Sequence, residues 1–141
     1  MTSQNAISVH WSFWVIAIGA LVWNGLGALN FIVQLDSQML HAYRDSERAL
    51  IENRPYWATI GFAMAVFGGV LGSVLLLLRK SVSLYVFVLS LVGVIVTQTH
   101  TLFIGVGLSV SEVLGIVLLP LIVALFLVWY AIWALRRGWT G

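Results

Sequence analysis

Cysteine is absent from this 141-residue chain, and charged residues make up only 9% of it. Without cysteine the chain can form no disulfide, no thiolate metal site and no thiol-based active site. A charged fraction this low is typical of a chain that lies in lipid, because soluble domains carry about 25%. Only two prolines, Pro55 and Pro120, occur, so little interrupts the formation of long helices.

Hydrophobic residues make up 61% of the chain and form four long runs. The runs cover residues 11–33, 57–78, 82–103 and 109–135. Each has about the 20 residues that a helix needs to cross a hydrocarbon layer of about 30 Å. Because backbone polar groups in lipid must be paired within the segment, we expect each run to be a helix. The predicted fold is an all-α integral membrane four-helix bundle, with residues 1–141 as one domain.

The placement of the basic residues predicts the orientation. Arg79 and Lys80 lie between the second and third runs, and Arg136 and Arg137 follow the fourth. An even number of spans puts both termini and both basic pairs on one side, which the positive-inside rule makes cytoplasmic. The first run is longer than a signal-peptide core and no Lys or Arg precedes it, so we expect no cleaved signal peptide.

The loop between the first two runs, residues 34–56, contains a short amphipathic pattern. Leu40, Tyr43, Leu50 and Ile51 fall near one helical face. This pattern predicts a short interfacial helix on the outer side, which Pro55 ends. Two interpretations are open: a lid over an outer cavity, or a connector that lies on the membrane surface.

Small residues on the second span form a ridge. Gly61, Gly68 and Gly72 recur at helical spacing, which favours close packing of two helices. We therefore expect a homo-oligomer or a larger membrane complex with this ridge as a contact surface. The fourth span is almost entirely Leu, Val and Ile, so we expect it to face lipid most and to kink at Pro120.

The polar residues of the spans are not scattered. By helical phase and depth, they predict a pocket that opens outward between the first, third and fourth spans, with Trp23 at its floor. The candidate solute-binding residues are Trp23, Asn24, Asn30, Gln34, Gln98 and His100. An aromatic face together with amides is the chemistry that a sugar site uses. The alternative interpretation is that the amides bond helix to helix and that His100 is a neutral, hydrogen-bonded histidine.

Several stretches of the chain carry a family resemblance. They are Trp57–Gly72 with Leu76–Lys80, Trp23-Asn24, Ser90-Leu91 with His100, and Leu127–Tyr130 with Arg136–Trp139. Together they resemble an uncharacterised bacterial family of small four-span proteins that is labelled "sugar transporter". The resemblance implies a multi-pass protein of the bacterial inner membrane and assigns no catalytic residue.

The chemistry that the spans lack narrows the function. No Asp, Glu, Lys or Arg lies deep in any span, which argues against a proton-coupled pump. No nucleophile–base pair, carboxylate pair or metal-ligand spacing is visible, so we expect no enzymatic activity, no cofactor and no metal. The basic residues form no stripe, so we expect no nucleic-acid partner.

Two functional hypotheses follow. The first is uncoupled transport or binding of a small neutral solute such as a sugar. The alternative is an accessory or assembly subunit that packs against a larger membrane complex. A solvated cavity reaching Trp23 would favour the first hypothesis. A dry core with an exposed glycine ridge would favour the second.

Overall fold

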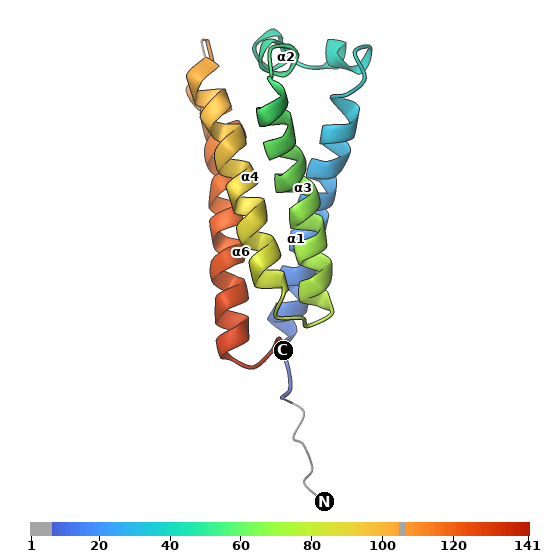
Figure 1. Cartoon of the computed structure of the whole chain (residues 1–141), viewed down its shortest axis with the longest axis vertical. Helices are drawn as coiled ribbons and strands as arrows, with labels where there is room; N and C mark the ends of the chain where they lie inside the picture. Colours follow the sequence, from blue (N-terminus) through green and yellow to red (C-terminus); the bar gives the residue numbers. More distant parts are fainter. Residues whose placement is uncertain (1–6, 105–106) are drawn as a thin grey trace, which may run out of the picture.

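The regular structure is entirely helical in the computed structural model, which describes residues 7–104 and 107–141. Four helices are long and apolar enough to span a membrane: α1 (Trp11–Val33), α3 (Tyr56–Leu77), α4 (Ser83–Ile104) and the continuous segment Val110–Arg136. They stand side by side along one axis, with the start of α1 and the C-terminus at one end, called the terminus-bearing end, and α2 at the other (Figure 1). The predicted spans agree with these helices to within one residue at each end.

The fourth span is not a uniform α-helix. It begins as α5 (Val110–Glu112), continues as the π-helical segment η2 (Val113–Leu118) and ends as α6 (Leu119–Arg136). Pro120 is the second residue after the π-helical segment. A proline in a helix has no N–H to donate and its ring crowds the preceding turn, so a wider turn before it relieves both problems. The sequence predicted a kink at Pro120, and the structure has a wider π-helical turn just before this residue.

The helices pack in the order α1, α3, α4, α6. Glycine makes the α3–α4 approach possible: a Cβ added to Gly93 would lie 2.5 Å from the Gly61 carbonyl oxygen. A Cβ on Gly72 would lie 2.8 Å from the Phe87 ring, and Gly68 faces Ser90 at 3.4 Å. The ridge Gly61, Gly68 and Gly72 therefore lies against α4 of its own chain. It is not free to serve as a contact surface for a second chain.

The largest hydrophobic core lies at the end that carries the termini. Phe13 and Ala17 of α1 meet Tyr130 and Ala134 of α6 there, with Phe87 of α4 in the same cluster. This cluster is where α1 and α6 close the bundle.

The C-terminal tail seals that end of the core. Trp139 is buried, and its carbonyl oxygen accepts a hydrogen bond of 2.7 Å from Arg79 Nε. The amide of Gly141 donates to the Arg79 carbonyl oxygen at 2.9 Å. Arg79 has a left-handed φ of 58°, which is how the chain turns at the end of α3. The C-terminal tail is thus hydrogen-bonded to the turn that connects α3 to α4.

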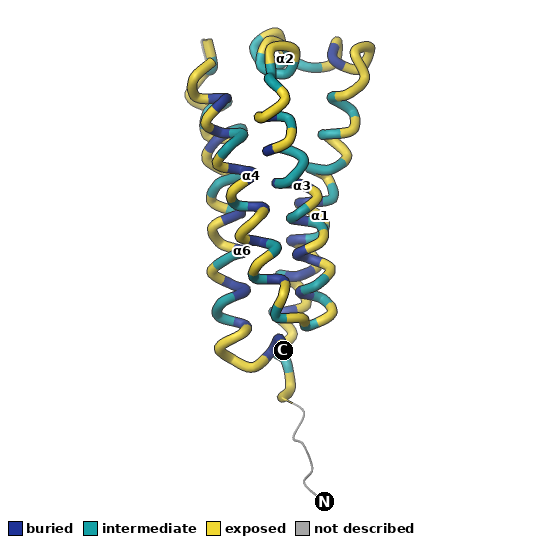
Figure 2. The backbone as a smooth tube through the Cα atoms, viewed as in Figure 1, coloured by how far each residue is buried: buried dark blue, intermediate teal, exposed yellow. Residues whose placement is uncertain are grey.

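The outer surface of the four helices is apolar. Buried residues follow the inward faces, while the outward faces are exposed along the length of the bundle (Figure 2). In the apolar window of each span, 22% of α1 and 22% of the fourth span is buried, against 39% of α3 and 33% of α4. The fourth span is therefore among the most exposed, as expected, but α1 is exposed to the same extent.

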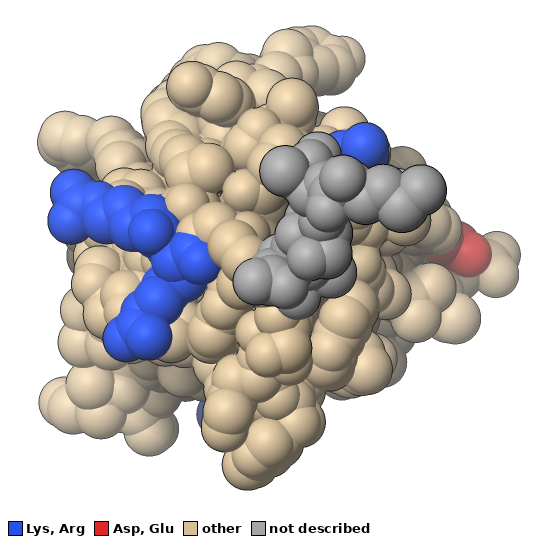
Figure 3. All heavy atoms as spheres, turned by 90° about the horizontal axis from the view of Figure 1, so that it is seen from below, with Lys and Arg blue, Asp and Glu red and all other residues tan. Residues whose placement is uncertain are grey.

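The two ends of the bundle differ in charge. Lys and Arg gather on the end that carries the termini, where α3 turns into α4 and α6 ends (Figure 3). The opposite end carries the segment between α1 and α3, which folds as η1 (Met39–Ala42) and α2 (Asp45–Glu52). Arg48 of α2 donates to the carbonyl oxygens of Leu40, His41 and Tyr43 at 3.1–3.3 Å and so holds η1 against α2.

Candidate functional site

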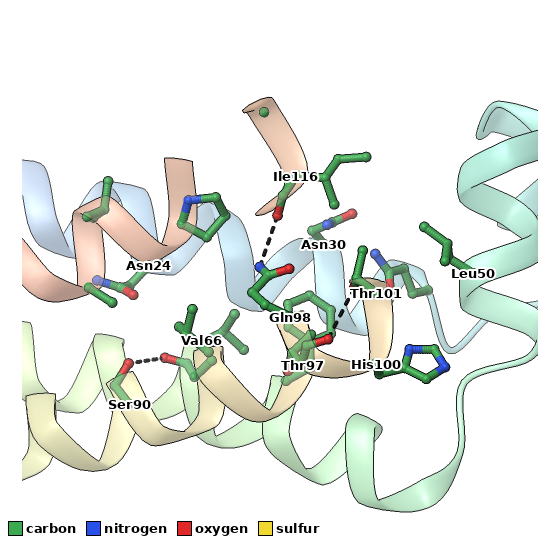
Figure 4. Close-up of a pocket in the computed structure, with 18 of the residues that line it drawn as sticks. Asn24, Asn30, Leu50, Val66, Ser90, Thr97, Gln98, His100, Thr101 and Ile116 are labelled. Carbon is green, nitrogen blue, oxygen red and sulfur yellow. Dashed lines mark hydrogen bonds between the residues drawn. The ribbon is translucent and has the colours of Figure 1, made fainter. Parts of the chain in front are cut away.

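A cavity of about 330 Å³ lies between the helices and extends from α2 towards the hydrophobic core at the opposite end. The four spans form its walls, and Glu47, Leu50 and Ile51 of α2 form its roof. Its floor is Phe87 and Leu127, which belong to the hydrophobic core below. Figure 4 shows the ligand-sized space with Asn24 and Ser90 towards one end and His100 and Leu50 towards the other.

All six candidate residues from the sequence line this one cavity: Trp23, Asn24, Asn30, Gln34, Gln98 and His100. Trp23 does not form the floor, because the cavity continues past it to Phe87. The Trp23 side chain is 39% exposed, so it stands at the margin between the cavity and the outer surface. Helical phase therefore grouped these residues correctly, but depth estimated from residue number misplaced Trp23.

Gln98 has a fixed orientation. Its Nε2 donates a hydrogen bond of 3.0 Å to the carbonyl oxygen of Ile116 (Figure 4). Ile116 lies four residues before Pro120, so its carbonyl cannot receive the usual α-helical N–H bond from residue 120. Because a carbonyl oxygen only accepts, the NH₂ group of Gln98 must face it. The Oε1 atom is then directed elsewhere, and it is buried without a partner among the described residues.

Unpaired polar atoms gather around the roofed half of the cavity. Six buried side-chain atoms lack a hydrogen-bond partner in the described part of the chain, and four belong to cavity residues. These four are Gln34 Oε1, Arg54 Nε, Gln98 Oε1 and His100 Nε2. Unpaired buried polar groups are uncommon and costly. These four atoms have no surface open to the cavity, so a bound solute can pair with them only if their side chains turn towards it.

Several other polar residues of the lining make hydrogen bonds within the protein. Asn24 Nδ2 donates to the Ala20 carbonyl oxygen at 2.9 Å, and Ser90 Oγ donates to that of Ala65 at 2.6 Å. Asn30 Oδ1 accepts a hydrogen bond from the Tyr43 hydroxyl. Two of the amides therefore bond between segments, as the alternative interpretation of these residues expected. Gln98 joins α4 to the fourth span, and Asn30 joins α1 to the roof.

The roof is tied to the fourth span by Glu112. This carboxylate accepts a hydrogen bond of 2.7 Å from Ser46 of α2 and lies 3.9 Å from Arg44. It also accepts from the backbone N–H of Ser109 at 2.8 Å, which completes a capping box at the start of α5. One side chain thus starts the fourth span and anchors the roof.

Arg54 is the cation of the lining. Its guanidinium lies 5.1 Å from the centre of the Phe62 ring, a cation–π distance. Burial lowers the pKa of Arg54, and the nearby Tyr43 acts in the opposite direction. Arginine keeps its charge through such shifts, so it remains a donor. No carboxylate among the described residues forms an ion pair with it.

The sequence missed the contribution of the roof to the site. Tyr43, Glu47, Leu50, Ile51 and Arg54 all come from the loop between α1 and α3. Three of them lay on the amphipathic face seen in the sequence, so the signal was present. That face was compatible with either a lid or a membrane-surface connector. In the structure it faces the cavity.

Within the described residues, no group of three His, Asp or Glu side chains is placed to hold a metal ion. The lining consists of amides, hydroxyl groups, aromatic rings, one histidine, one arginine and one glutamate above an apolar floor. Such a lining suits reversible binding through hydrogen bonds and van der Waals contact. No protein-family model, curated protein or solved structure matches this chain, so its relation to the four-span bacterial family stays a prediction from the sequence.

Proposed function

We propose that this protein binds a small uncharged solute in the cavity and gives it passage across the bacterial inner membrane without coupling to an ion. In this proposal both termini are cytoplasmic and α2 lies at the outer surface as a lid. The basic residues at the terminus-bearing end support that orientation.

One observation carries the proposal: a cavity whose roofed half is surrounded by buried polar atoms without partners. Side chains that served only to bond helix to helix would be paired with one another. Gln98 does bond to Ile116, but its oxygen remains free. A solute with hydroxyl groups can both accept from Arg54 and donate to amide oxygens, which suits this set of atoms.

The positions of the charged residues in the lining favour uncoupled passage. The charged residues of the cavity lining are Glu47 and Arg54, and both belong to the roof. Proton-driven and ion-driven transporters place ionisable side chains within the spans. Among the described residues that line the cavity from the spans, His100 is the ionisable one, and it lies near the α2 end of α4 with no carboxylate beside it in the lining of the spans.

The accessory-subunit hypothesis has lost its proposed contact surface. The glycine ridge of α3 is covered by α4 of the same chain. A partner protein or a second copy of this chain would have to bind another face. The mass spectrometry experiment described next would detect such a partner.

Native mass spectrometry of the protein in lipid nanodiscs, extracted without detergent, tests the proposal. We expect a bound small molecule on the wild-type protein and its loss from Ala124→Phe, because Ala124 is buried in the cavity wall. Ile122→Phe is the matched control, since Ile122 is 59% exposed on the outer face of the same helix. Equal retention by both variants, or a partner protein in place of a small molecule, would contradict the proposal.

A further inference from the structure

The lining of the cavity separates into two halves along the bundle axis. The half under α2 contains Gln34, Arg54, Gln98 and His100, which hold the unpaired polar atoms. The half nearer the floor is lined by apolar side chains, chiefly Phe87, Val94, Val123, Ala124 and Leu127. The two polar residues in that half, Asn24 and Ser90, each donate one hydrogen bond to a backbone carbonyl oxygen.

The cavity is long for its volume. Its lining on α4 runs from Phe87 to Thr101, which at 1.5 Å per residue is about 20 Å. On the fourth span it runs from Gly115 to Leu127, about 18 Å by the same rise. A volume of about 330 Å³ spread over that length describes a narrow channel rather than a rounded pocket.

A free monosaccharide suits only one half of this channel. A sugar ring carries hydroxyl groups on every side, and those that faced Val94 or Val123 would lose their bonds to water without replacement. An apolar chain makes no such demand and gains contact with the same side chains. The channel therefore fits a molecule that is polar at one end and apolar at the other.

The margin of the channel offers such a molecule a route from the lipid. Trp23 lines the channel and is 39% exposed on the outer surface. It stands on α1, which approaches α6 through the core cluster at the terminus-bearing end. An apolar chain can therefore contact Trp23 from the lipid and from the channel.

The polar half of the channel, under α2, determines which head group can bind. Gln98 Oε1 can only accept, because the NH₂ group of the same amide is held by Ile116. Arg54 Nε can only donate. A carboxylate would satisfy Arg54 but not the Gln98 oxygen, and Glu47 in the same lining would repel it. Hydroxyl groups both donate and accept, so a head group that carries several of them can serve each of these partners.

We propose that the ligand is a single-chain amphiphile, with an uncharged hydroxyl-bearing head group under α2 and its apolar chain in the channel towards Phe87. This inference rests on the proposed function and names the class of solute.

Binding of three radiolabelled probes to the protein in nanodiscs tests it, with empty nanodiscs subtracted. Octyl glucoside carries head and chain, glucose carries the head alone, and octanoate carries a chain with an anionic head. We expect saturable binding of octyl glucoside at least about tenfold tighter than that of glucose or octanoate, because only it fills both halves. Ala124→Phe should weaken octyl glucoside binding by about tenfold or more, and Ile122→Phe should leave it unchanged. Val123→Phe repeats the test if Ala124→Phe fails to fold.

Each other result has a separate meaning. Glucose binding as tight as octyl glucoside would overturn the amphiphile and leave the proposed function standing. Tighter binding of octanoate would overturn the uncharged head group. If no probe binds saturably, the inference fails, and the proposed function then depends on the species retained in the mass spectrometry experiment.

Discussion

The hydrogen bond from Gln98 to the Ile116 carbonyl oxygen predicts that Gln98 and Pro120 are energetically coupled, although these two residues do not bond to each other. Gln98→Leu removes the donor, and Pro120 offers no N–H in its place, so the Ile116 carbonyl oxygen loses this bond. The loss of an interhelical hydrogen bond in a membrane protein costs about 0.6 kcal/mol, with a maximum near 1.7. We therefore expect Gln98→Leu to lower the free energy of unfolding by about 0.6–1.7 kcal/mol.

Pro120→Ala supplies the missing N–H. In that background the Ile116 carbonyl oxygen has a backbone donor whether or not Gln98 is present, so Gln98→Leu should cost less by about 1 kcal/mol. A double-mutant cycle on reversible unfolding in micelles measures this difference. Thr99→Val on the same helix is the control, because Thr99 is exposed and bonds only to Ile95 of its own helix. An equal cost of Gln98→Leu with and without Pro120 would refute the reasoning.

Three further predictions concern packing, the roof and the orientation. Gly72→Ala should lower the free energy of unfolding by about 1–3 kcal/mol, because its Cβ would lie 2.8 Å from the Phe87 ring. Gly25→Ala, with no neighbour within 4 Å, should be neutral or slightly stabilising, and equal effects would contradict the packing described here. Glu112→Ala should speed amide hydrogen exchange in α2 about tenfold through loss of the Ser46 bond, and Arg44→Ala should do much less, since Arg44 is 72% exposed. Unchanged exchange in Glu112→Ala would mean that other contacts hold the roof. For orientation, the chain has no cysteine, so Glu52→Cys and Lys80→Cys each introduce a single thiol. An impermeant reagent applied outside should label only position 52, and labelling of position 80 instead would invert the proposed topology.

The sequence predicted the helices well because their lengths follow from hydrophobicity alone. All four spans agree with the structure to within one residue at each end. Helical periodicity also placed the six candidate residues on faces that line one cavity. Whether they bind a solute stays a prediction.

What the sequence could not predict depends on contacts between segments. The glycine ridge indicated close packing, but only the three-dimensional arrangement shows that α4 of the same chain covers it. The roof depends on Ser46 and Glu112, which are 66 residues apart and share no pattern. The depth of Trp23 was misjudged because residue number gives height along a helix but not where a cavity ends.

The π-helical segment before Pro120 has a consequence for comparing this chain with its relatives. A helical wheel drawn at 100° per residue over the whole fourth span would misplace Glu112 by about one residue's rotation relative to α6. A relative without proline at position 120 could lose one residue between positions 113 and 118 and form a regular α-helix. Its counterpart of Glu112 would still face the roof. In an alignment of such sequences, a single-residue gap inside this membrane span would record a change of helix type, although gaps within spans are ordinarily taken as alignment errors.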